Sequence, residues 1–453
     1  MAYVFTRPAS RLAGPVRSLS LTVALAALVG SAIALRADAP HVYAITGARV
    51  VTASGPVLDA ATVVLRRGAI EAVGPGVSPP PDATVIDGKG LAVYPGMIDM
   101  GTSVALNVPA IDPPRDARTR MEIERVRRQA LIRGSFDAAA ALKADAPELK
   151  RLAAAGITTI LATPPGEGIT GRSALVNVVG PEDPPQVGQV ADERRGLFVL
   201  RAPVALHVAF PSREADIYPA SLMGGIAFIR QAFLDAGHHQ QERAAYEKSA
   251  PGSMARPIHD PGLEALQPAV GRKLPVVFEA DGRVEIRRAL ALARELGLDA
   301  IIGNGVEADQ VAADLAAAGA RVIYSLNYPT RPRTLAPDAD EPLRLLRQRA
   351  DAPKVPAALA RAGVPFAFKS GGLKDPADFV KNAARAVKAG LPADAAVRAL
   401  TIDAARMAGV ADRLGSVEKG KLANLVIVDG DLFAEKTRIR HVFVDGRMVE
   451  LPR

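Results

Sequence analysis

The sequence predicts an α/β fold, a TIM-like (β/α)8 barrel with a small β-sandwich domain built from both chain ends. In the middle of the chain, buried-strand runs alternate with helical runs over short connections. This rhythm favours parallel strands joined by right-handed crossovers. Both ends instead hold short strands and turns without helical periodicity. Either end alone has too little core to be stable, so we expect the two to pair.

The first residues form a segment that we expect to lie outside this fold. Three arginines precede an apolar run at 19–35, and Ala-Ile-Ala at 32–34 offers a small-residue cleavage site. This order is typical of a secretory signal over 1–34, which predicts an exported protein, periplasmic or secreted. An uncleaved membrane anchor is the alternative, because the apolar run nearly reaches the length that spans a bilayer.

The β-sandwich domain is expected from residues 40–93 together with 412–453. In both parts, short apolar runs are separated by Asp-Gly pairs, at 87–88, 429–430 and 445–446. Asp-Gly between two apolar runs is a strong signal for a tight turn between strands.

The barrel is expected from residues 94–411. The candidate strands are the seven apolar runs at 91–99, 155–163, 203–210, 274–280, 299–305, 321–327 and 363–370. Seven is close to the eight strands of a closed α/β barrel.

Helical periodicity marks the segments between and around these strands. Residues 284–297 and 307–319 are predicted helices, the second with Ala318 on its apolar side. Two longer stretches interrupt the rhythm and are predicted to be helical insertions, 107–145 and 222–248. We expect both to lie outside the repeating strand–helix pattern.

The composition excludes several kinds of site. The chain has no Cys, which excludes disulfides, thiolate metal sites and thiol nucleophiles. Its net charge of +8 comes from scattered Lys and Arg, and aromatic residues make up only 4%. Without a basic stripe or aromatic side chains to stack on bases, we expect no nucleic-acid partner.

Taken in order, these segments resemble the amidohydrolase superfamily, nearest to its imidazolonepropionase-like and prolidase-like branches. Residues 85–99, "VIDGKGLAVYPGMID", resemble the family's entry into the barrel, and residues 399–433 resemble its exit. The resemblance covers essentially the whole chain after the N-terminal segment. It implies a hydrolase acting on carbon–nitrogen bonds other than peptide bonds, with zinc or another divalent metal at the barrel mouth.

The positions that the resemblance would assign to metal ligands are substituted. They are Gly101 and Ser103 in place of a His-x-His pair, Glu279 after the fifth strand, Gly303 or Asn304 after the sixth, and Gly371 after the eighth. Glycine has no donor side chain, and a serine hydroxyl is a feeble zinc ligand. We therefore predict a degenerate site that holds no metal.

The histidines offer little replacement. His207 lies in an apolar run, where a core role is the plainer interpretation, and His259 lies in a Pro-rich loop that could approach the barrel mouth. His238 and Glu242 are one helical turn apart, a spacing that can bind metal, but no third ligand is in sight.

Polar residues nevertheless fall at predicted carboxyl ends of strands, where barrel sites are built. Glu279, Asp281 and Lys369 are the candidate catalytic residues, and Asn304 and Asn327 are candidates for ligand binding. A Glu–Lys pair could perform acid–base chemistry or bind a zwitterion. In the plainer interpretation the two charges neutralise each other where a metal once stood.

Three functional hypotheses follow. The first is an exported amidohydrolase-related protein without catalysis, which binds a small polar or peptide-like molecule, forms a homo-oligomer or pairs with an active homologue. The alternative is an active hydrolase of carbon–nitrogen bonds, acting on a cyclic amide or peptide-like substrate with an altered active site. A sugar- or peptide-binding module unrelated to hydrolysis is the third.

Overall fold

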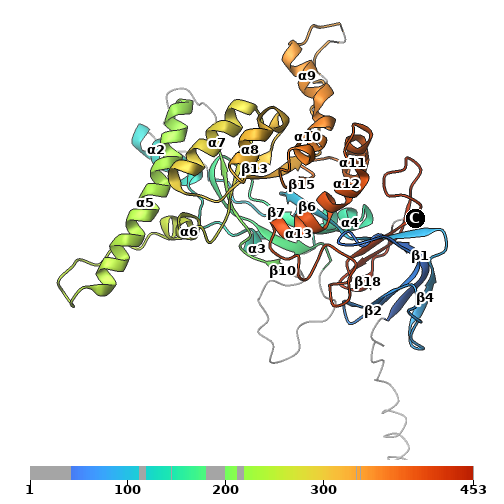
Figure 1. Ribbon diagram of the computed structural model, residues 1–453. Coiled ribbons are helices and arrows are strands. Elements are labelled where there is room, and N and C mark those ends of the chain that lie inside the picture. The colour runs from blue at the N-terminus through green and yellow to red at the C-terminus, as the bar shows by residue number, and fades with distance from the viewer. Residues whose placement is uncertain are drawn as a thin grey trace, which may run out of the picture. The chain divides into compact units, whose positions relative to one another are not determined.

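The computed structural model describes residues 42–111, 119–143, 145–179, 199–211, 219–332, 334–336 and 338–451 (Figure 1). From Val42 onward the described residues form one compact unit. The secretory signal predicted over 1–34 lies outside the described residues. None of the described helices is long and apolar enough to cross a membrane.

Both ends of the chain contribute to one eight-stranded sheet. Its order is β18-β17-β16-β5-β1-β2-β3, with β4 beside β1. The strands are β1 (Tyr43–Val50), β2 (Leu58–Arg66), β3 (Ala69–Gly74), β4 (Thr84–Asp87), β5 (Leu91–Pro95), β16 (Leu425–Asp429), β17 (Ile439–Val444) and β18 (Arg447–Met448). The expected pairing of the two ends is thus present, through β5 against β16. A sandwich of two layers stays a prediction.

The chain leaves this sheet at Gly96. The predicted single run at 91–99 is split there, because β5 belongs to the eight-stranded sheet whereas β6 (Met97–Thr102) belongs to another. A Cβ atom at Gly96 would lie 2.2 Å from Thr158 Oγ1. No side chain fits at the crossing, so glycine lets the two sheets approach each other closely.

Two further sheets contain the remaining strands. One has the order β10-β9-β7-β6 and the other β15-β14-β13-β12-β11-β8. The strands are β7 (Ile157–Ala162), β8 (Gly168–Arg172), β9 (Ala174–Asn177), β10 (Val199–Arg201), β11 (Leu206–Ala209), β12 (Val276–Ala280), β13 (Ala300–Asn304), β14 (Arg321–Ser325) and β15 (Phe366–Lys369). From β11 to β15, neighbouring strands are parallel, as expected.

Strands β8 and β9 depart from an all-parallel pattern. β9 is antiparallel to β7, and β8 is antiparallel to β11. Only residues 163–173, which include β8, separate β7 from its neighbour β9, too few for the crossover that a parallel neighbour needs. Between β8 and β9, the Ser173 backbone N–H donates to Ala205 O at 2.9 Å. The β8–β9 segment therefore runs from one sheet into the other.

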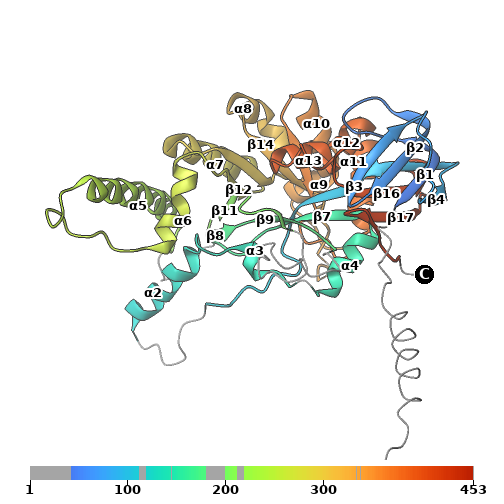
Figure 2. The same cartoon turned by 90° about the horizontal axis from the view of Figure 1, so that it is seen from below.

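The helices cover these two sheets (Figures 1 and 2). They are α2 (Arg120–Leu131), α3 (Ala138–Ala141), α4 (Pro147–Ala154), α5 (Leu222–Lys248), α6 (Pro261–Val270), α7 (Arg283–Leu296), α8 (Ala312–Ala317), α9 (Leu343–Asp351), α10 (Val355–Arg361), α11 (Asp378–Lys388), α12 (Ala393–Leu400) and α13 (Ile402–Met407), with 3-10 turns at Ala308–Val311 and Ala352–Lys354. Helix α5 matches the predicted insertion at 222–248. The helix predicted over 307–319 is shorter, and Ala318 is exposed beyond its end.

One apolar cluster joins the two sheets of the α/β part. Val277, Ile301, Ile323 and Ala367 from β12 to β15 pack in it with Ile98, Met100 and Leu161 from β6 and β7. The edge strands β6 and β15 also meet, since the Ser370 backbone N–H after β15 donates to Asp99 Oδ1 of β6 at 2.8 Å. The candidate site lies directly beyond this cluster, toward the carboxyl ends of the strands.

Candidate functional site

A polar layer follows the apolar cluster along the parallel strands. Glu279 pairs in register with Gly303, and Ser325 pairs with Lys369. Each of these residues comes two positions after a member of the apolar cluster, so alternation places it on the same face of the sheet. Toward the carboxyl ends of the strands, the residues on this face therefore change from apolar to polar between one alternating position and the next.

The centre of this layer is an ion pair between Lys369 and Glu279. Lys369 Nζ lies 2.7 Å from Glu279 Oε2. The lysine is 7% exposed, and the glutamate side chain is 23% exposed. The structure thus brings together two of the three predicted catalytic residues. Glu279 is on β12 and Lys369 is on β15, and 90 residues separate them in sequence.

His207 is the third member of this cluster. Its Nδ1 lies 3.8 Å from Glu279 Oε1, too far for a hydrogen bond, and neither ring nitrogen has a hydrogen-bond partner among the described residues. Burial lowers the pKa of His207, against the opposing effect of Glu279. Its imidazole is therefore neutral at pH 7. The burial of His207 agrees with the predicted core role. One edge of its ring nevertheless faces the Glu279 carboxylate.

The electrostatics favour an ionised Glu279. Burial works to raise the pKa of Glu279, but the charge of Lys369 and the neighbouring His207 outweigh it and hold that pKa at about 2. An opposite charge at hydrogen-bond distance stabilises the carboxylate in this way. Glu279 is thus matched to its cation and poorly suited to take up a proton near neutral pH.

Asp99 lies on the β6 side of the same cluster and is fully buried. Its Oδ1 accepts from the backbone N–H groups of Gly101, at 3.1 Å, and Ser370, at 2.8 Å. Its Oδ2 has no hydrogen-bond partner among the described residues. Burial raises the pKa of the Asp99 carboxyl against these hydrogen bonds and the charge of Lys369. This residue fastens the β6 edge to the segment that follows β15.

Three of the substituted ligand positions have no room for a side chain, and at Gly371 the Cβ atom would collide with Ser325 Oγ. A Cβ atom at Gly101 would lie 2.8 Å from Lys369 Cδ, and one at Gly303 would lie 2.6 Å from Glu279 Oε2. Contacts this short do not occur between real atoms without movement of one partner. Lys369 and Glu279 therefore fill the space that side chains at 101 and 303 would need.

The residues present do not fit a divalent metal. Glu279 is already bound to an ammonium group, and the position of the expected His-x-His pair offers only Gly101 and the exposed Ser103. In the part of the chain that the structure describes, no three His, Cys, Asp or Glu side chains gather as a metal site would require. That the protein binds no metal stays a prediction.

Asp281, the third predicted catalytic residue, follows β12 and is exposed. Its backbone N–H donates to Glu285 Oε2 at 2.9 Å. Loss of hydration, together with the Glu285 carboxylate, raises the pKa of Asp281 to about 6, although Lys369 opposes the shift. Asp281 lines an open pocket of about 710 Å³ with Arg283 and Arg344, a pocket that the ion pair does not line.

The predicted ligand-binding residues are placed differently from each other. Asn327 Nδ2 donates to Gly371 O at 2.9 Å, so this amide holds the loop that follows β15. Asn304 ends β13 with a left-handed backbone, at φ 68°, and pairs in register with Ala280 and Tyr324. The structure therefore assigns Asn327 a structural contact and leaves Asn304 next to the polar layer.

Three further histidines, on α5 and in the loop that follows it, lie away from the polar layer. His238 is exposed on α5, whereas His239 is buried and bonds Ile258 O at 2.8 Å. His259 Nδ1 lies 3.0 Å from Glu264 Oε1, on the α5–α6 side of the molecule. The alternative that His259 approaches the barrel mouth is therefore not supported by its contacts.

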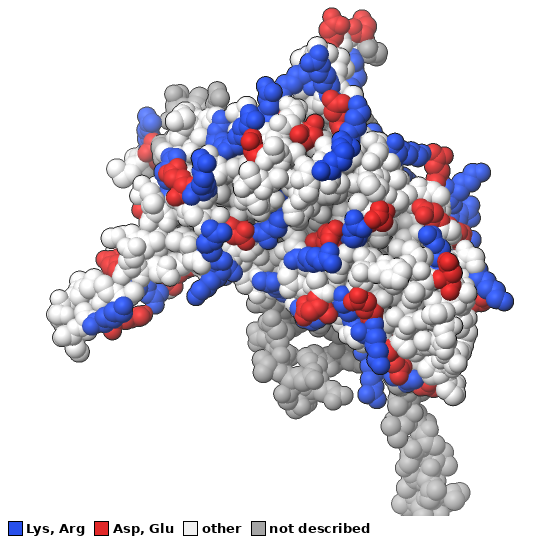
Figure 3. Space-filling model, in the orientation of Figure 1, with Lys and Arg blue, Asp and Glu red and all other residues white. Residues whose placement is uncertain are grey.

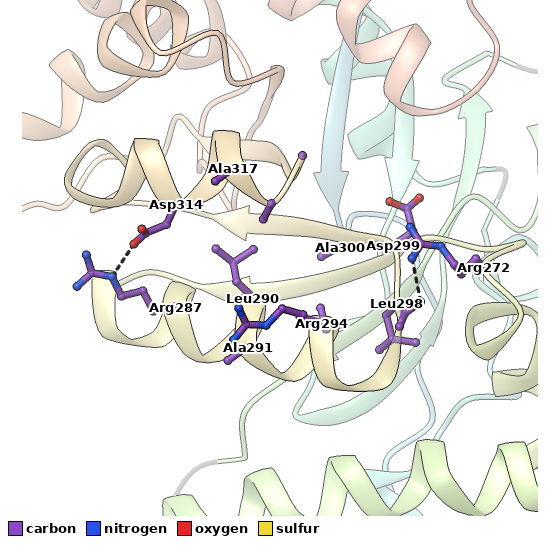
Figure 4. Close-up of a pocket in the computed structure, with 14 residues that line it drawn as sticks. Arg272, Arg287, Leu290, Ala291, Arg294, Leu298, Asp299, Ala300, Asp314 and Ala317 are labelled. Carbon is purple, nitrogen blue, oxygen red and sulfur yellow. Dashed lines mark hydrogen bonds and ion pairs between the residues drawn. The ribbon is translucent and has the colours of Figure 1, made fainter.

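Another pocket lies elsewhere in the molecule. Figure 4 shows this pocket of about 750 Å³ between α7, α8 and the start of β13. It lies at the amino end of β13, opposite the strand ends that form barrel sites. Its carboxylates are paired, because Arg287 binds Asp314 and Arg321 binds Asp299, each at 2.6 Å. On the face shown in Figure 3, acidic and basic side chains are likewise interspersed.

Sequence reasoning missed two members of the site, His207 and Asp99. His207 stands opposite Val277, two positions before Glu279, so the register of β11 against β12 brings them together. Asp99 was visible only as part of the phrase at the barrel entry. Period-two alternation along two neighbouring parallel strands could have found the first contact, whereas the second depends on how β6 meets β15.

Comparisons with known proteins agree with the resemblance. Residues 317–449, which are less than half of the chain, match the model of the Amidohydrolase family. No curated protein matches the sequence. The fold is similar to that of an amidohydrolase from Thermotoga maritima, with a TM-score of 0.72, 21% identity, and coverage of 90% of this chain and 100% of that chain.

A second solved structure with a similar fold is a prolidase in complex with N-methylphosphonate-L-proline. Its TM-score is 0.52 at 17% identity, and the match covers 91% of this chain and 100% of the prolidase. At these identities the likeness shows a shared mixed α/β fold. The family match and these neighbours together support the amidohydrolase superfamily.

Proposed function

We propose that this protein is an amidohydrolase-superfamily member with a closed (β/α)8 barrel, a β-sandwich domain and a degenerate metal site, and that it acts without catalysis. The observation that carries the proposal is the ion pair: the Lys369 ammonium bonds Glu279 at 2.7 Å, and its chain fills the space beside Gly101. The lysine ammonium group neutralises the carboxylate there, a role that the resemblance assigns to a metal ion.

Physical chemistry explains why such a pair would persist. Two buried charges cost several kcal/mol each in lost hydration, which a close partner and further hydrogen bonds offset. Once a metal is gone, a carboxylate such as Glu279 needs another cation or must be replaced. Lys369, which belongs to the same polar layer, supplies that cation. The barrel interior therefore stays neutralised and packed without a bound metal ion.

The role that we propose is ligand binding or regulation. A small polar or peptide-like molecule would bind at the carboxyl ends of the strands, and the protein would form a homo-oligomer or pair with an active homologue. We further propose export, with residues 1–34 acting as a secretory signal. Both proposals rest on the sequence and on the placement of polar residues at the strand ends.

One observation favours the rival function, a hydrolase of carbon–nitrogen bonds with an altered site. Asp281 has a pKa of about 6, within the range in which a carboxyl group can exchange protons near neutral pH. It stands two residues after Glu279, next to a pocket with several arginines. In this function Asp281 would serve as general acid or base, with Lys369 holding the substrate carboxylate.

Metal content and hydrolysis measured together distinguish the two. Untagged protein is incubated with excess Zn²⁺, dialysed, and its zinc measured by mass spectrometry; Xaa-Pro dipeptides and cyclic amides are then assayed. We expect far less than one zinc per chain and no hydrolysis. Stoichiometric zinc whose removal abolishes hydrolysis would refute the proposal. Hydrolysis without zinc that Asp281→Asn abolishes, while Asp309→Asn keeps it, would establish the rival.

A further inference from the structure

An apolar pocket of about 680 Å³ lies between α11 and the segment that connects β16 to β17. Val380 and Ala384 of α11 form one wall, and Phe433, Ile439 and Leu451 line the other side. All five are partly exposed. The volume lies within the range of pockets that bind small organic ligands, and open apolar surface of this kind commonly marks a binding site.

The pattern of α11 creates this pocket. Phe379, Ala383 and Ala386 are buried and attach the helix to the core. Val380 and Ala384 are four residues apart and therefore form a second apolar stripe, in which Val380 also packs against the edge of the core. Because Ala384 is small, the stripe leaves a hollow in front of the β16–β17 segment. The helix thus has one apolar face for folding and another that no described side chain fills.

The rim of the pocket is strongly cationic. Four basic side chains line it, against the single carboxylate of Glu435; they are Lys381, Arg385, Lys388 and Arg438. Lys388 is paired with Glu435, and Lys381 with Asp378 at 3.1 Å. The Arg385 guanidinium lies over the Tyr328 ring. Arg438 has no ion pair within the described part of the chain; its charge helps to lower the pKa of Asp429, whose carboxylate is bound by Arg440, so the Arg438 guanidinium can still bind a ligand.

We propose that this pocket binds an amphipathic anion, a medium-chain carboxylate whose alkyl chain lies against Val380, Phe433 and Ile439 and whose carboxylate meets Arg438. Burial of an alkyl chain supplies the main driving force, and a guanidinium is well suited to a carboxylate. A cationic amphiphile would meet an excess of like charge. The inference is independent of the proposed function, because none of these residues contacts Lys369 or Glu279.

Calorimetric titration with decanoate, below its micelle concentration and at low salt, tests the proposal on the full chain. Decyltrimethylammonium, with the same chain length and the opposite charge, is the matched ligand. We expect saturable binding of one decanoate per chain and at least tenfold weaker binding of the cation. Equal binding of both ligands, or no binding of decanoate, would overturn the proposal.

Three variants locate the site. Ala384→Trp fills the hollow and should weaken decanoate binding at least tenfold. Arg438→Gln should weaken it about fivefold, as expected for a partly exposed ion pair, whereas Lys436→Gln, which removes the same charge outside the pocket, should leave it unchanged. Equal effects of the two charge variants would contradict the proposal. So would sedimentation that shows two chains associating through this face in competition with decanoate.

Discussion

Two buried polar clusters of this molecule differ in kind. At the junction of the sheets, Asn424 Nδ2 donates to Asn177 Oδ1 at 2.8 Å and to Thr159 Oγ1 at 3.2 Å, while its Oδ1 accepts from the Asp445 backbone at 2.7 Å. This network is neutral and nearly complete, since among the described residues only its Asn177 Nδ2 lacks a partner. The strand-end cluster is charged and leaves Asp99 Oδ2 and both nitrogens of His207 without partners.

The contrast in charge and in hydrogen bonding indicates a different role for each cluster. A neutral network with matched donors and acceptors holds two parts of a fold together at little electrostatic cost. A charged cluster with unmatched polar atoms is a costly way to fill a core, and such clusters concentrate at functional sites. We therefore interpret the Asn424 network as structural and the Lys369–Glu279 cluster as an altered functional site.

The largest expected effect is on the charged cluster. Lys369→Met removes the cation and leaves the partly buried Glu279 without its ion-pair partner, which should lower the free energy of unfolding by about 3 kcal/mol. The double variant Lys369→Met, Glu279→Met should recover most of this loss, because no charge remains. Urea denaturation measures both. Lys354→Met, which breaks an exposed pair, is the control and should change little.

The neutral network should respond less strongly and without rescue by a second substitution. Asn424→Ala leaves the Asp445 N–H unpaired and removes one of the two donors to Asn177 Oδ1, which keeps Thr159 Oγ1 at 3.1 Å. We expect a cost of about 2 kcal/mol of unfolding free energy. In the same urea assay, adding Asn177→Ala should not restore stability. If the double variant recovered, the two clusters would not differ as we describe.

The close packing of the polar layer predicts a smaller cost at Gly303. Gly303→Ala brings a methyl group against the Glu279 carboxylate and should destabilise by about 1 kcal/mol, a typical cost of overpacking. Thermal unfolding measures this. Gly76→Ala, where a Cβ meets nothing within 4 Å, is the matched control. Equal melting temperatures for both variants would show that the polar layer accommodates a methyl group at position 303 without a clash.

The smallest effect concerns the pH dependence of Asp281. Its pKa is raised to about 6, so its protonated form favours the folded state: the stabilisation is complete below the unfolded pKa and is lost as pH rises through 6. Because the side chain is exposed, the effect should stay below about 1 kcal/mol. Asp281→Asn should flatten the stability profile between pH 4 and 6, measured by urea denaturation. An unchanged profile would assign that pH dependence to other groups.

Much of the architecture could be predicted because it follows local signals. The Asp-Gly pair at 445–446 takes up left-handed backbone at both residues, with φ 51° and 73°, as a tight hairpin turn requires. Helix α5 begins and ends where its pattern does. The antiparallel β8 and β9 could not be predicted, because short β strands carry no direction in their sequence and only the missing crossover reveals it.

The candidate site could be predicted in part. Strand-end placement anticipated that Glu279 and Lys369 lie together, because residues at carboxyl ends of parallel strands converge; their role in function stays a prediction. The contact of His207 with Glu279 depends on the register between two strands, and the bonds of Asp99 depend on the meeting of β6 with β15. Both are long-range facts that no local pattern contains.

We propose that the Lys369 ammonium stands where the resemblance places a metal ion. Diffraction from a crystal soaked in ZnCl₂, recorded at the zinc absorption edge, tests it most directly. We predict no anomalous peak in the polar layer and an intact contact between Lys369 Nζ and Glu279 Oε2. A zinc ion coordinated by Glu279 and His207, with Lys369 displaced, would contradict the account.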